Sequence, residues 1–319
     1  MTPPPKQGAL KETRVSATVA VSTRDRGDAV GATIASLLSN DWPEFELVVI
    51  DQSRDDQTRD CVRTFGSDPR LRYVRTSTTG LSASRNIALA EATHDLVVMT
   101  DDDCVVASNF VRMMIEEMRA DPSLTLVFAD VFEGSPRTER CTPVNRANGS
   151  YSVSSLDEWG SNDGVNIGIG AAMAFRTSAV AGMGGFDELL GAGAVFRSAE
   201  DTDLALRVLL CGGRIRRTTR TWVYHYGSRD IGEIRELIRG ALFGVGAACG
   251  KLIRARHPAV VIYLGRLFWT TVVVAGWVEV KRGRRPPVLG RAVQLGTGLL
   301  AGLRQPAGGR HLLFDPLHV

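Results

Sequence analysis

The sequence predicts an α/β protein with a mostly parallel central sheet flanked by helices and a helical C-terminal extension. Two observations lead to this prediction. Short apolar runs alternate with segments of helical spacing through the first hundred residues, which is typical of parallel strands joined by helical crossovers. Polar clusters follow several of these runs, and open parallel sheets bind ligands outside the carboxyl ends of their strands.

The elements of the first half can be assigned in order. Apolar and β-branched runs predict strands over Val15–Ser22, Phe45–Ile50, Leu71–Val74 and Leu96–Thr100. Helical spacing predicts helices over Asp28–Leu38, Thr58–Phe65 and Ser82–Ala92, with further helices beginning near Ser108 and covering Thr202–Cys211. Helices of this length between strands favour parallel pairing with right-handed crossovers.

The last third of the chain is helical and apolar. Helical spacing covers Ile231–Leu242, and two apolar stretches follow, Ala259–Val280 with Arg266 inside it and Val288–Leu303. The basic cluster Lys281–Arg285 lies between them. Three alternatives are a helical cap on the α/β domain, an interfacial platform whose cations meet anionic lipids, and a short membrane hairpin. Arg266 argues against the hairpin, and the platform is favoured.

Domain organisation follows from these assignments. Residues 1–14 are expected to be a disordered lead-in, 15–228 a catalytic domain, and 229–319 a helical extension that associates with a membrane if the platform reading holds. The N-terminal MTPPPKQGAL has no apolar segment, so no secretory signal is expected. The five cysteines form no close pairs and no metal-ligand spacing, which favours reduced thiols in a cytoplasmic protein. If the C-terminal helices form an interfacial platform, the protein would be peripheral on the inner face of the cell membrane.

The composition is that of an ordinary globular protein. The chain has 319 residues, of which 44% are hydrophobic and 23% charged. A formal net charge of +3 is too small to indicate a nucleic-acid partner, and none is expected. The length allows one large domain with a sizeable core plus an appendage.

Three consecutive carboxylates, Asp101, Asp102 and Asp103, follow the apolar run that ends at Thr100. Adjacent like charges repel, and a divalent cation relieves this repulsion because Mg²⁺ and Mn²⁺ take carboxylate and phosphate oxygens together. Alternation along an extended end would place Asp101 and Asp103 on one side and Asp102 on the other. A metal and phosphate clamp is therefore favoured over the alternative, a cluster of helix N-caps.

Two other polar clusters follow strand ends and are expected to share one crevice with these acids. They are Ser22-Thr23-Arg24 after the first strand and Asp51-Gln52-Ser53 after the second. The Gly-rich dinucleotide fingerprint is missing after the first strand, and no Walker-type loop is present. A classical dinucleotide site or a P-loop is therefore not indicated.

The order of motifs resembles a family 2 glycosyltransferase with the GT-A fold, of the bacterial, non-processive type. The motifs that carry the resemblance are S-T-R-D-R, V-V-I-D-Q-S, G-L-S-A-S-R-N, T-D-D-D, Gly168–Arg176, G-G-F-D-E and E-D-T-D-L, within Val15–Gly227. Two departures concern the nucleotide base. Ser22-Thr23-Arg24-Asp25 stands where a Pro-Thr-Tyr-Asn-like turn is usual, and Gln52 follows Asp51 where a second acid is frequent.

The resemblance implies a donor site for a nucleotide-diphosphate sugar linked to UDP, GDP or dTDP. Asp103 resembles the direct ligand of Mg²⁺ or Mn²⁺, Asp101 the residue that contacts ribose and metal, and Asp51 the acceptor of a hydrogen bond from the base. Asp102 would orient its neighbours, while Ser22, Thr23, Arg24 and Ser53 would line the nucleotide. For Asp51 the alternative is an ordinary turn residue at a strand end.

Two more donor-side residues come from the resemblance, each with an alternative. Arg85 resembles a helix-borne arginine that could fork onto a phosphate, the alternative being a surface arginine on an amphipathic helix. His225 resembles a late histidine near the metal or diphosphate, the alternative being a packed core histidine.

On the acceptor side, Asp201 resembles the catalytic base of inverting members, and Glu200 beside it is a second candidate that would bind acceptor hydroxyls. The alternative is that these acids simply open a helix, where they suit the positive end of its dipole. Trp159 and Asp163 are candidates for the acceptor side, with core packing an equal alternative for Trp159.

These residues predict a metal-dependent glycosyltransferase, of the hexosyltransferase type, that inverts the anomeric centre. The acceptor would be a glycan, a lipid-linked or a small-molecule hydroxyl. The absence of a long multi-span region argues against a polymer-exporting synthase. A nucleotidyltransferase of related fold is the runner-up, but it calls for a Gly-rich basic loop that this chain does not have. A catalytically inactive nucleotide-sugar-binding protein is the other alternative, and the intact Asp101, Asp103 and Asp201 argue against it.

Overall fold

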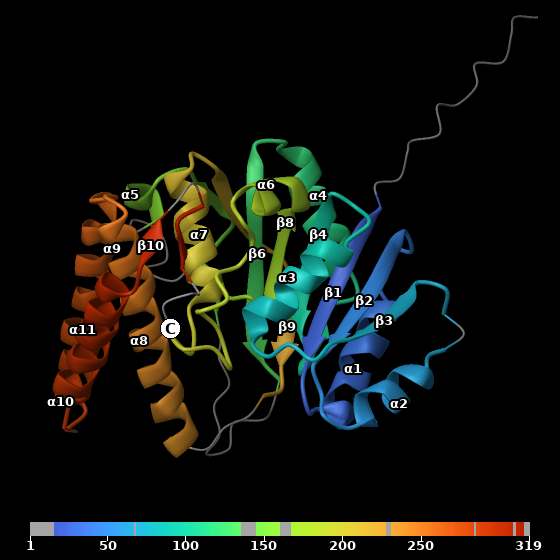
Figure 1. Cartoon of the computed structure of the whole chain (residues 1–319), viewed down its shortest axis with the longest axis horizontal. Coiled ribbons are helices and arrows are strands. Elements are labelled where there is room, and N and C mark those ends of the chain that lie inside the picture. Colours follow the sequence, from blue (N-terminus) through green and yellow to red (C-terminus); the bar gives the residue numbers. More distant parts are fainter. Residues whose placement is uncertain are drawn as a thin grey trace, which may run out of the picture.

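The computed structural model describes residues 16–66, 68–134, 145–159, 167–227, 231–283, 285–308 and 311–315. The predicted lead-in over 1–14 lies outside them. The strands of the central sheet are β1 (Ala17–Thr23), β2 (Phe45–Asp51), β3 (Leu71–Arg75), β4 (Leu96–Asp101), β5 (Cys104–Val106), β6 (Leu124–Glu133), β7 (Tyr151–Val153), β8 (Ala172–Arg176) and β9 (Arg214–His225). Their order is β3-β2-β1-β4-β8-β6-β9-β5, and β7 pairs with the opposite end of β9 (Figure 1).

Seven helices accompany these strands in the described part of the first 227 residues. They are α1 (Gly27–Leu38), α2 (Gln57–Arg63), α3 (Leu81–Glu91), α4 (Phe110–Ala120), α5 (Leu156–Trp159), α6 (Thr177–Gly182) and α7 (Glu200–Leu210). The predicted alternation of four strands and three helices in the first hundred residues is confirmed, with bounds that agree to within about two residues.

The parallel pairing predicted for the first half is confirmed, since β3, β2, β1 and β4 are all parallel neighbours. Residue Thr23 lies opposite Asp51, and Ser22 lies opposite Asp101. This register brings three polar strand ends to one edge of the sheet. The side chains of a ligand site therefore come from segments nearly eighty residues apart.

The second half of the sheet is mixed, which the prediction of a mostly parallel sheet did not anticipate. Strand β8 runs antiparallel to β4 and β6, and β9 runs parallel to β6 but antiparallel to β5 and β7. Apolar periodicity identifies a strand but carries no information about its direction. Only helical crossovers indicated direction, and the connections in this half are not regular crossovers.

Helices cover both faces of the sheet. On one face α1, α2 and α4 pack against it through an apolar cluster that includes Val30, Ile34 and Leu37, the stripe predicted for α1. On the other face the cluster contains residues of α3, α6 and α7 together with Cys249 and Leu252 from the C-terminal part. Both faces of the central strands are thus buried, as near-continuous apolar runs such as that of β4 require.

The C-terminal helices are α8 (Ile231–Arg254), α9 (Ala259–Phe268), the π-helical turn η1 (Trp269–Val274), α10 (Ala275–Lys281) and α11 (Val288–Arg304). Two short strands follow, β10 (Ala307–Gly308) and β11 (Leu313–Phe314). Helix α8 lies next to the sheet domain, and α9, α10 and α11 form an outer layer at one end of the molecule (Figure 1). The domain boundary predicted at 228/229 falls on residues that the structure does not describe.

Helices α8 and α11 touch along their backbones. A Cβ atom built on Gly298 would lie 2.0 Å from the carbonyl oxygen of Phe243, and one on Gly302 would lie 2.1 Å from that of Ala247. Only glycine allows such an approach.

A buried cluster of charges joins α8 to the sheet domain. The Nζ atom of Lys251 lies 2.7 Å from Asp187 and 2.6 Å from Asp203, and Asp203 also pairs with Arg207 at 2.8 Å. The same Asp187 carboxylate accepts a hydrogen bond from the backbone N–H of Phe314. All four side chains are at most 2% exposed, so each charge depends on its partners. The cluster ties α7, whose first residues are predicted to be catalytic, to the C-terminal helices.

Candidate active site

A cavity of about 290 Å³ opens where β1, β2 and β4 end. Its walls come from six separate segments of the chain, because the parallel strand ends meet the start of α3, the end of β9 and the glycine-containing loop before α7. The lining residues are Ser22, Thr23, Arg24, Arg26, Gln52, Gly80, Leu81, Asp101, Asp102, Asp103, Ala192, Gly193 and His225. The structure therefore brings together the predicted Ser22–Arg24 segment, the three acids and His225.

Asp102 is buried. Its carboxylate accepts hydrogen bonds from Thr23 Oγ1 at 2.7 Å and from Arg26 at 3.0 Å, while its carbonyl oxygen accepts one from Thr33. Burial raises its pKa to about 6, and the Arg26 charge and the Thr23 hydrogen bond oppose this rise. These contacts fix the turn after β4, which is the orienting position expected for Asp102.

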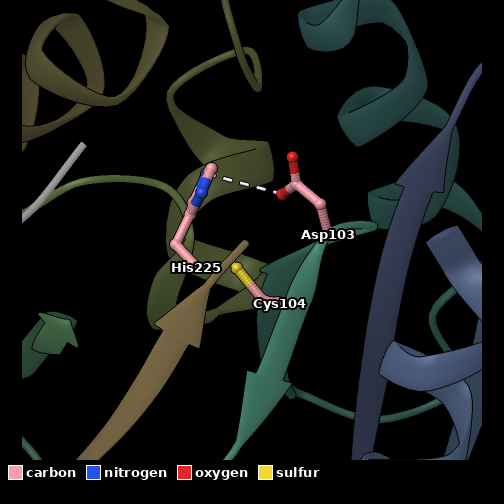
Figure 2. Close-up of side chains that lie close together, drawn as sticks. All are labelled: Asp103, Cys104 and His225. Carbon is pink, nitrogen blue, oxygen red and sulfur yellow. Dashed lines mark ion pairs between the residues drawn. The ribbon is translucent and has the colours of Figure 1, made fainter. Parts of the chain in front are cut away.

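Asp101 and Asp103 converge on His225. The imidazole Nε2 lies 3.4 Å from Asp103 Oδ1 and 3.9 Å from Asp101 Oδ2. His225 is the last residue of β9, and its antiparallel pairing with β5 places it opposite Cys104, next to Asp103. Figure 2 shows the imidazole and the Asp103 carboxylate facing each other across this pair of strands.

One oxygen of this group lacks a partner. Asp103 Oδ1 is buried and has no hydrogen-bond partner among the residues that the structure describes, whereas Oδ2 accepts a hydrogen bond from Arg26 at 2.8 Å. A buried carboxylate oxygen without a donor is unfavourable unless a cation or ligand meets it. Together with Asp101 and the imidazole it forms an O/N donor set that suits Mg²⁺ or Mn²⁺. The residues thus fit a divalent cation.

The tautomer of His225 bears on this fit. Its Nδ1 accepts a hydrogen bond from the backbone N–H of Gly227 at 3.2 Å, so a neutral ring carries its proton on Nε2, directed at Asp103. Metal binding through Nε2 requires the proton to move to Nδ1, which breaks the bond from Gly227. In the arrangement described, Nε2 lies 3.4 Å from Asp103 Oδ1 without forming a hydrogen bond to it.

Cys104 completes a group of three candidate ligands with Asp103 and His225, whose ligating atoms lie within 4.8 Å of one another. Burial raises the pKa of the Cys104 thiol well above its ordinary value, and the neighbouring acids add to this. A neutral thiol is a poor ligand for hard cations. Cys104 was not among the predicted site residues, because only the β5–β9 pairing brings it near His225.

Arg26 is the main site residue that the sequence did not identify. Its guanidinium, about half exposed, bonds both Asp102 and Asp103. The repulsion among the three acids is therefore relieved partly by this arginine, and a metal is not the only cation they meet. Arg26 follows the predicted Arg24 by two residues, but no spacing rule indicated which of the two would turn toward the acids.

Arg85 is neither a surface arginine nor part of the cavity wall, where it could reach a phosphate directly. The side chain is only 3% exposed, so it is not a surface arginine. Its guanidinium donates to Glu200 at 2.8 Å and to Asp101 at 3.3 Å, and it does not line the cavity. A Cβ atom on Gly170 would lie 2.3 Å from Arg85 Nη2, so glycine at 170 leaves room for this ion pair. Arg85 thus links the metal-side acid Asp101 to the start of α7.

Asp51 is fully buried, and both of its oxygens are occupied. Oδ2 accepts a hydrogen bond from the Tyr73 hydroxyl at 2.6 Å, and Oδ1 accepts one from the backbone N–H of Ser53 at 2.8 Å. This is the arrangement of the alternative, a turn residue at a strand end. Burial and the Asp51 carboxylate raise the pKa of Tyr73.

A second hollow beside the cavity, of about 690 Å³, lies next to this turn but does not include Asp51. It is lined by Arg24, Gln52, Ser53, Arg54, Arg75, Thr76, Ser77, Thr78 and Thr79. The predicted residues Arg24 and Ser53 lie here, and Arg24 belongs to both hollows. A nucleotide extending from the acids would therefore meet Gln52 and Ser53 before Asp51.

Glu200 and Asp201 open α7, as the helix-start alternative expected. Asp201 accepts hydrogen bonds from the backbone N–H of Thr202 at 2.6 Å and of Gly170 at 2.8 Å. Glu200 is buried against Arg85, and its pKa is raised by burial and by the Asp201 charge. Neither acid lines the cavity of the three aspartates. They are joined to it through Arg85.

The two candidates for the acceptor side have different outcomes. Trp159 is buried in the core, with its ring centroid 5.0 Å from that of Tyr263 in α9, so core packing is the correct alternative. Asp163 lies outside the described residues.

Comparison with known proteins agrees with the fold and the motifs. The profile of the family described as "Glycosyl transferase family 2" matches residues 18–180, just over half of the chain. The pre-mycofactocin glycosyltransferase of Mycobacterium tuberculosis is 28% identical over 186 residues, which are 56% of this chain and 36% of that protein. The poly-beta-1,6-N-acetyl-D-glucosamine synthase of Staphylococcus epidermidis is 25% identical over 114 residues, 35% of this chain and 26% of that one. The chain thus spans about a third or less of these relatives.

Solved structures share the fold at low sequence identity. The mannosyltransferase PcManGT from Pyrobaculum calidifontis, in complex with GDP-Man and Mn²⁺, has a TM-score of 0.61 and 17% identity, covering 90% of this chain and 87% of that one. S. aureus TarS 1–349 in complex with UDP-GlcNAc has a TM-score of 0.56 and 17% identity, covering 89% of both chains. The predicted GT-A fold and the resemblance are both confirmed, and the chain belongs to glycosyl transferase family 2.

Proposed function

We propose that this protein transfers a sugar from a nucleotide-diphosphate donor to an acceptor hydroxyl, with inversion at the anomeric carbon. The observation that carries the proposal is the buried, unpartnered Oδ1 of Asp103, which faces His225 in a cavity at the parallel strand ends. Membership of glycosyl transferase family 2 supports it. The donor would be linked to UDP, GDP or dTDP, and the acceptor would be a glycan, a lipid-linked or a small-molecule hydroxyl.

Asp103 and Asp101 would hold Mg²⁺ or Mn²⁺, with His225 as a third ligand once its proton moves to Nδ1. The cation, when bound, stabilises the negative charge of the leaving diphosphate. Arg26 already pairs with Asp103 and would stay close to the phosphates. Arg24, whose guanidinium is one-third exposed between the two hollows, is positioned to pair with a phosphate oxygen.

The nucleoside would occupy the second hollow. The amide nitrogen of Gln52 donates to Thr78 Oγ1 and to the carbonyl oxygen of Gly80, which fixes its side chain beside the opening. The remaining lone pairs of Gln52 and Ser53 can then meet donors on ribose or base. We place Asp51 behind this surface, where it supports the turn that carries both residues.

Asp201 would take the proton of the acceptor hydroxyl as its oxygen attacks the anomeric carbon and the bond to the diphosphate breaks. Each carboxylate oxygen has two lone pairs, so the hydrogen bonds from Gly170 and Thr202 leave room for this proton while holding the group in place. Glu200 would hold Arg85, and through it Asp101, so that the donor and acceptor sides keep a fixed separation.

The test is nucleoside diphosphate release from a panel of nucleotide sugars, with Mn²⁺ or Mg²⁺ and with a chelator. We expect one donor class to be turned over only with the metal. Asp201→Asn should lower turnover by about 10²-fold or more while donor binding persists. Asp60→Asn, an exposed acid on α2, is the matched control and should keep full activity. If no donor is bound or turned over, the proposal fails, and if Asp201→Asn is fully active, the assignment of the base fails.

A further inference from the structure

The outer layer of C-terminal helices exposes a series of large apolar side chains. Residue Trp269 is 61% exposed, Trp277 is 60% exposed and Leu289 is 78% exposed, although each is large and apolar. Their spacing along the two helices puts them on one stripe of each helix. We define the outer face as Ile262, Trp269, Val273, Trp277, Val280, Leu289, Val293 and Leu300, all of which are exposed. Soluble proteins rarely leave an apolar face of this kind uncovered.

The opposite side of the same helix is packed against the protein. Val260, Tyr263, Leu267 and Val272 are buried there. In the middle of the helix Arg266 donates to the backbone carbonyls of Leu156 and Asp157, which belong to α5 of the catalytic half. The helix is therefore attached lengthwise to the domain.

Helix length alone would allow a different arrangement. The continuous helix Ala259–Lys281 has 23 residues, and an 18-residue window within it has a mean hydropathy of 1.7, enough by length and composition to cross a bilayer. A crossing helix would have to release Arg266 and the buried residues on its inner side, and a charged Arg266 would then lie near the bilayer centre. Helix α11 is fixed to it as well, because Arg291 donates to the carbonyl of Thr271 at 2.8 Å.

The charge around the outer face has one sign. From Arg256 to Gly308 the sequence holds eight lysines and arginines but one acid, Glu279. Of these, Lys281, Arg282 and Arg285 are exposed at the end of α10, next to the outer face. Glu279 lies 3.3 Å from Arg282, so its charge is locally offset. An apolar stripe beside a basic cluster is complementary to an anionic surface that also accepts apolar side chains.

We propose that the outer face docks on an anionic phospholipid bilayer, with α9, α10 and α11 lying in the plane of the interface. The aliphatic residues would enter the boundary between headgroups and acyl chains. Trp269 and Trp277 would sit at headgroup depth, where amphipathic rings are favoured. The exposed cations would pair with lipid phosphates. This proposal goes beyond sugar transfer and does not depend on it, because no residue of the outer face lines either hollow of the donor site.

A second copy of the chain is the competing occupant of this face. In a two-fold dimer the same patch meets itself, and Glu279 is the one acid in this part of the sequence that could pair with the basic cluster of the other copy. The charge pattern therefore favours a lipid surface. The two cases also predict different measurements, since a dimer depends on protein concentration and a docked monomer on lipid composition.

The test is flotation of the full chain with phosphatidylcholine vesicles, with and without phosphatidylglycerol. We expect binding that needs the anionic lipid and weakens with salt. The double variant Trp269→Glu/Trp277→Glu should lower binding by about tenfold or more, and so should Arg282→Glu/Arg285→Glu. Arg63→Glu, an exposed arginine on α2 far from this face, is the matched control and should bind like the wild type. Donor turnover in solution should be unchanged in all variants, which separates failure here from failure of the proposed function.

Depth is tested by quenching of tryptophan fluorescence with brominated lipids. We expect quenching in the wild type and its loss in Trp269→Phe/Trp277→Phe, which retains the three remaining tryptophans. Three results would overturn the proposal. They are vesicle binding that the outer-face variants do not change, a dimer without vesicle binding that the same variants dissociate, and a membrane-bound protein that only detergent releases.

Discussion

At the scale of single residues, the site depends on how six charged side chains share their partners. Arg26 meets Asp102 and Asp103, while Arg85 meets Asp101 and Glu200. Each arginine joins two segments that are far apart in the chain. Because these pairs are mostly buried, removing one member leaves its partner uncompensated and costs more than the pair itself contributes. The acids are thereby held in place before any ligand arrives.

Glu200 gives a residue-scale prediction about pH. Burial and the Asp201 charge raise its pKa to about 7 in the folded protein from an ordinary value of 4.5, although Arg85 opposes this. A carboxyl group of this kind holds its proton more tightly when folded, so the free energy of unfolding falls as pH rises from about 4.5 to about 7. Glu200→Gln cannot titrate. The free energy of unfolding of this variant, relative to that of the wild type, should therefore rise across this pH window by up to about 3 kcal/mol.

Urea unfolding of both proteins between pH 4.5 and 7.5 measures this difference. The lost contact with Arg85 shifts the whole curve of the variant but does not change its slope with pH. Parallel curves for the two proteins would show that Glu200 stays ionised throughout, as a pair with Arg85.

At the scale of elements, the α8–α11 contact depends on glycine at the crossing points. Gly298→Ala would place a Cβ atom 2.0 Å from the carbonyl oxygen of Phe243, so the helices must separate. We expect a loss of about 1–3 kcal/mol in the free energy of unfolding. Gly296→Ala lies two residues away on the same helix and meets no atom within 4 Å. This substitution should raise the free energy of unfolding by up to about 1 kcal/mol, because alanine is the better helix former.

The two denaturation midpoints check this contrast within one helix. Equal effects of both substitutions would show that α11 does not pack on α8 as described.

The buried charge cluster gives a second prediction at this scale. Lys251→Met removes the cation that Asp187 and Asp203 share, and it should destabilise the protein by about 3–5 kcal/mol. Lys281→Met, at an exposed lysine of α10, is the control and should change stability by less than about 0.5 kcal/mol. Thermal unfolding followed by circular dichroism measures both. A small effect of Lys251→Met would mean that α8 is held mainly by apolar packing.

At the scale of the whole molecule, the C-terminal helices share a core with the catalytic half. Cys249 and Leu252 of α8 and Tyr263 of α9 belong to the same buried cluster as Met99 of β4 and Leu204 of α7. A chain ending at residue 227 would expose this cluster. We expect such a truncated chain to lose cooperative urea unfolding, whereas the full chain should show one transition. A truncated chain that unfolds cooperatively with unchanged donor binding would show that the two parts are independent.

The sequence predicted most of this fold because its signals were local. Apolar periodicity identified β1 to β4 and α1 to α3, and the polar strand ends indicated one crevice. Strand direction in the second half was missed, because a run such as Ala172–Arg176 reads the same in either direction. The polar residues after the strand ends are also local signals, so the sequence predicted the outline of the site. The sequence did not predict the ion pairs of the site, since Arg85 and Glu200 meet across 115 positions that no spacing rule connects.

We expect Asp103 to bind a metal together with the donor nucleotide, and calorimetric titration measures this binding directly. Nucleoside diphosphate and Mn²⁺ would be titrated into the wild type, Asp103→Asn and Asp201→Asn. We expect metal-dependent nucleotide binding in the wild type and in Asp201→Asn, since Asp201 does not line the cavity of the three aspartates. Asp103→Asn should weaken it by about 10–100-fold or more, because the variant loses the unpartnered carboxylate oxygen. Unchanged binding by a folded Asp103→Asn would contradict the account.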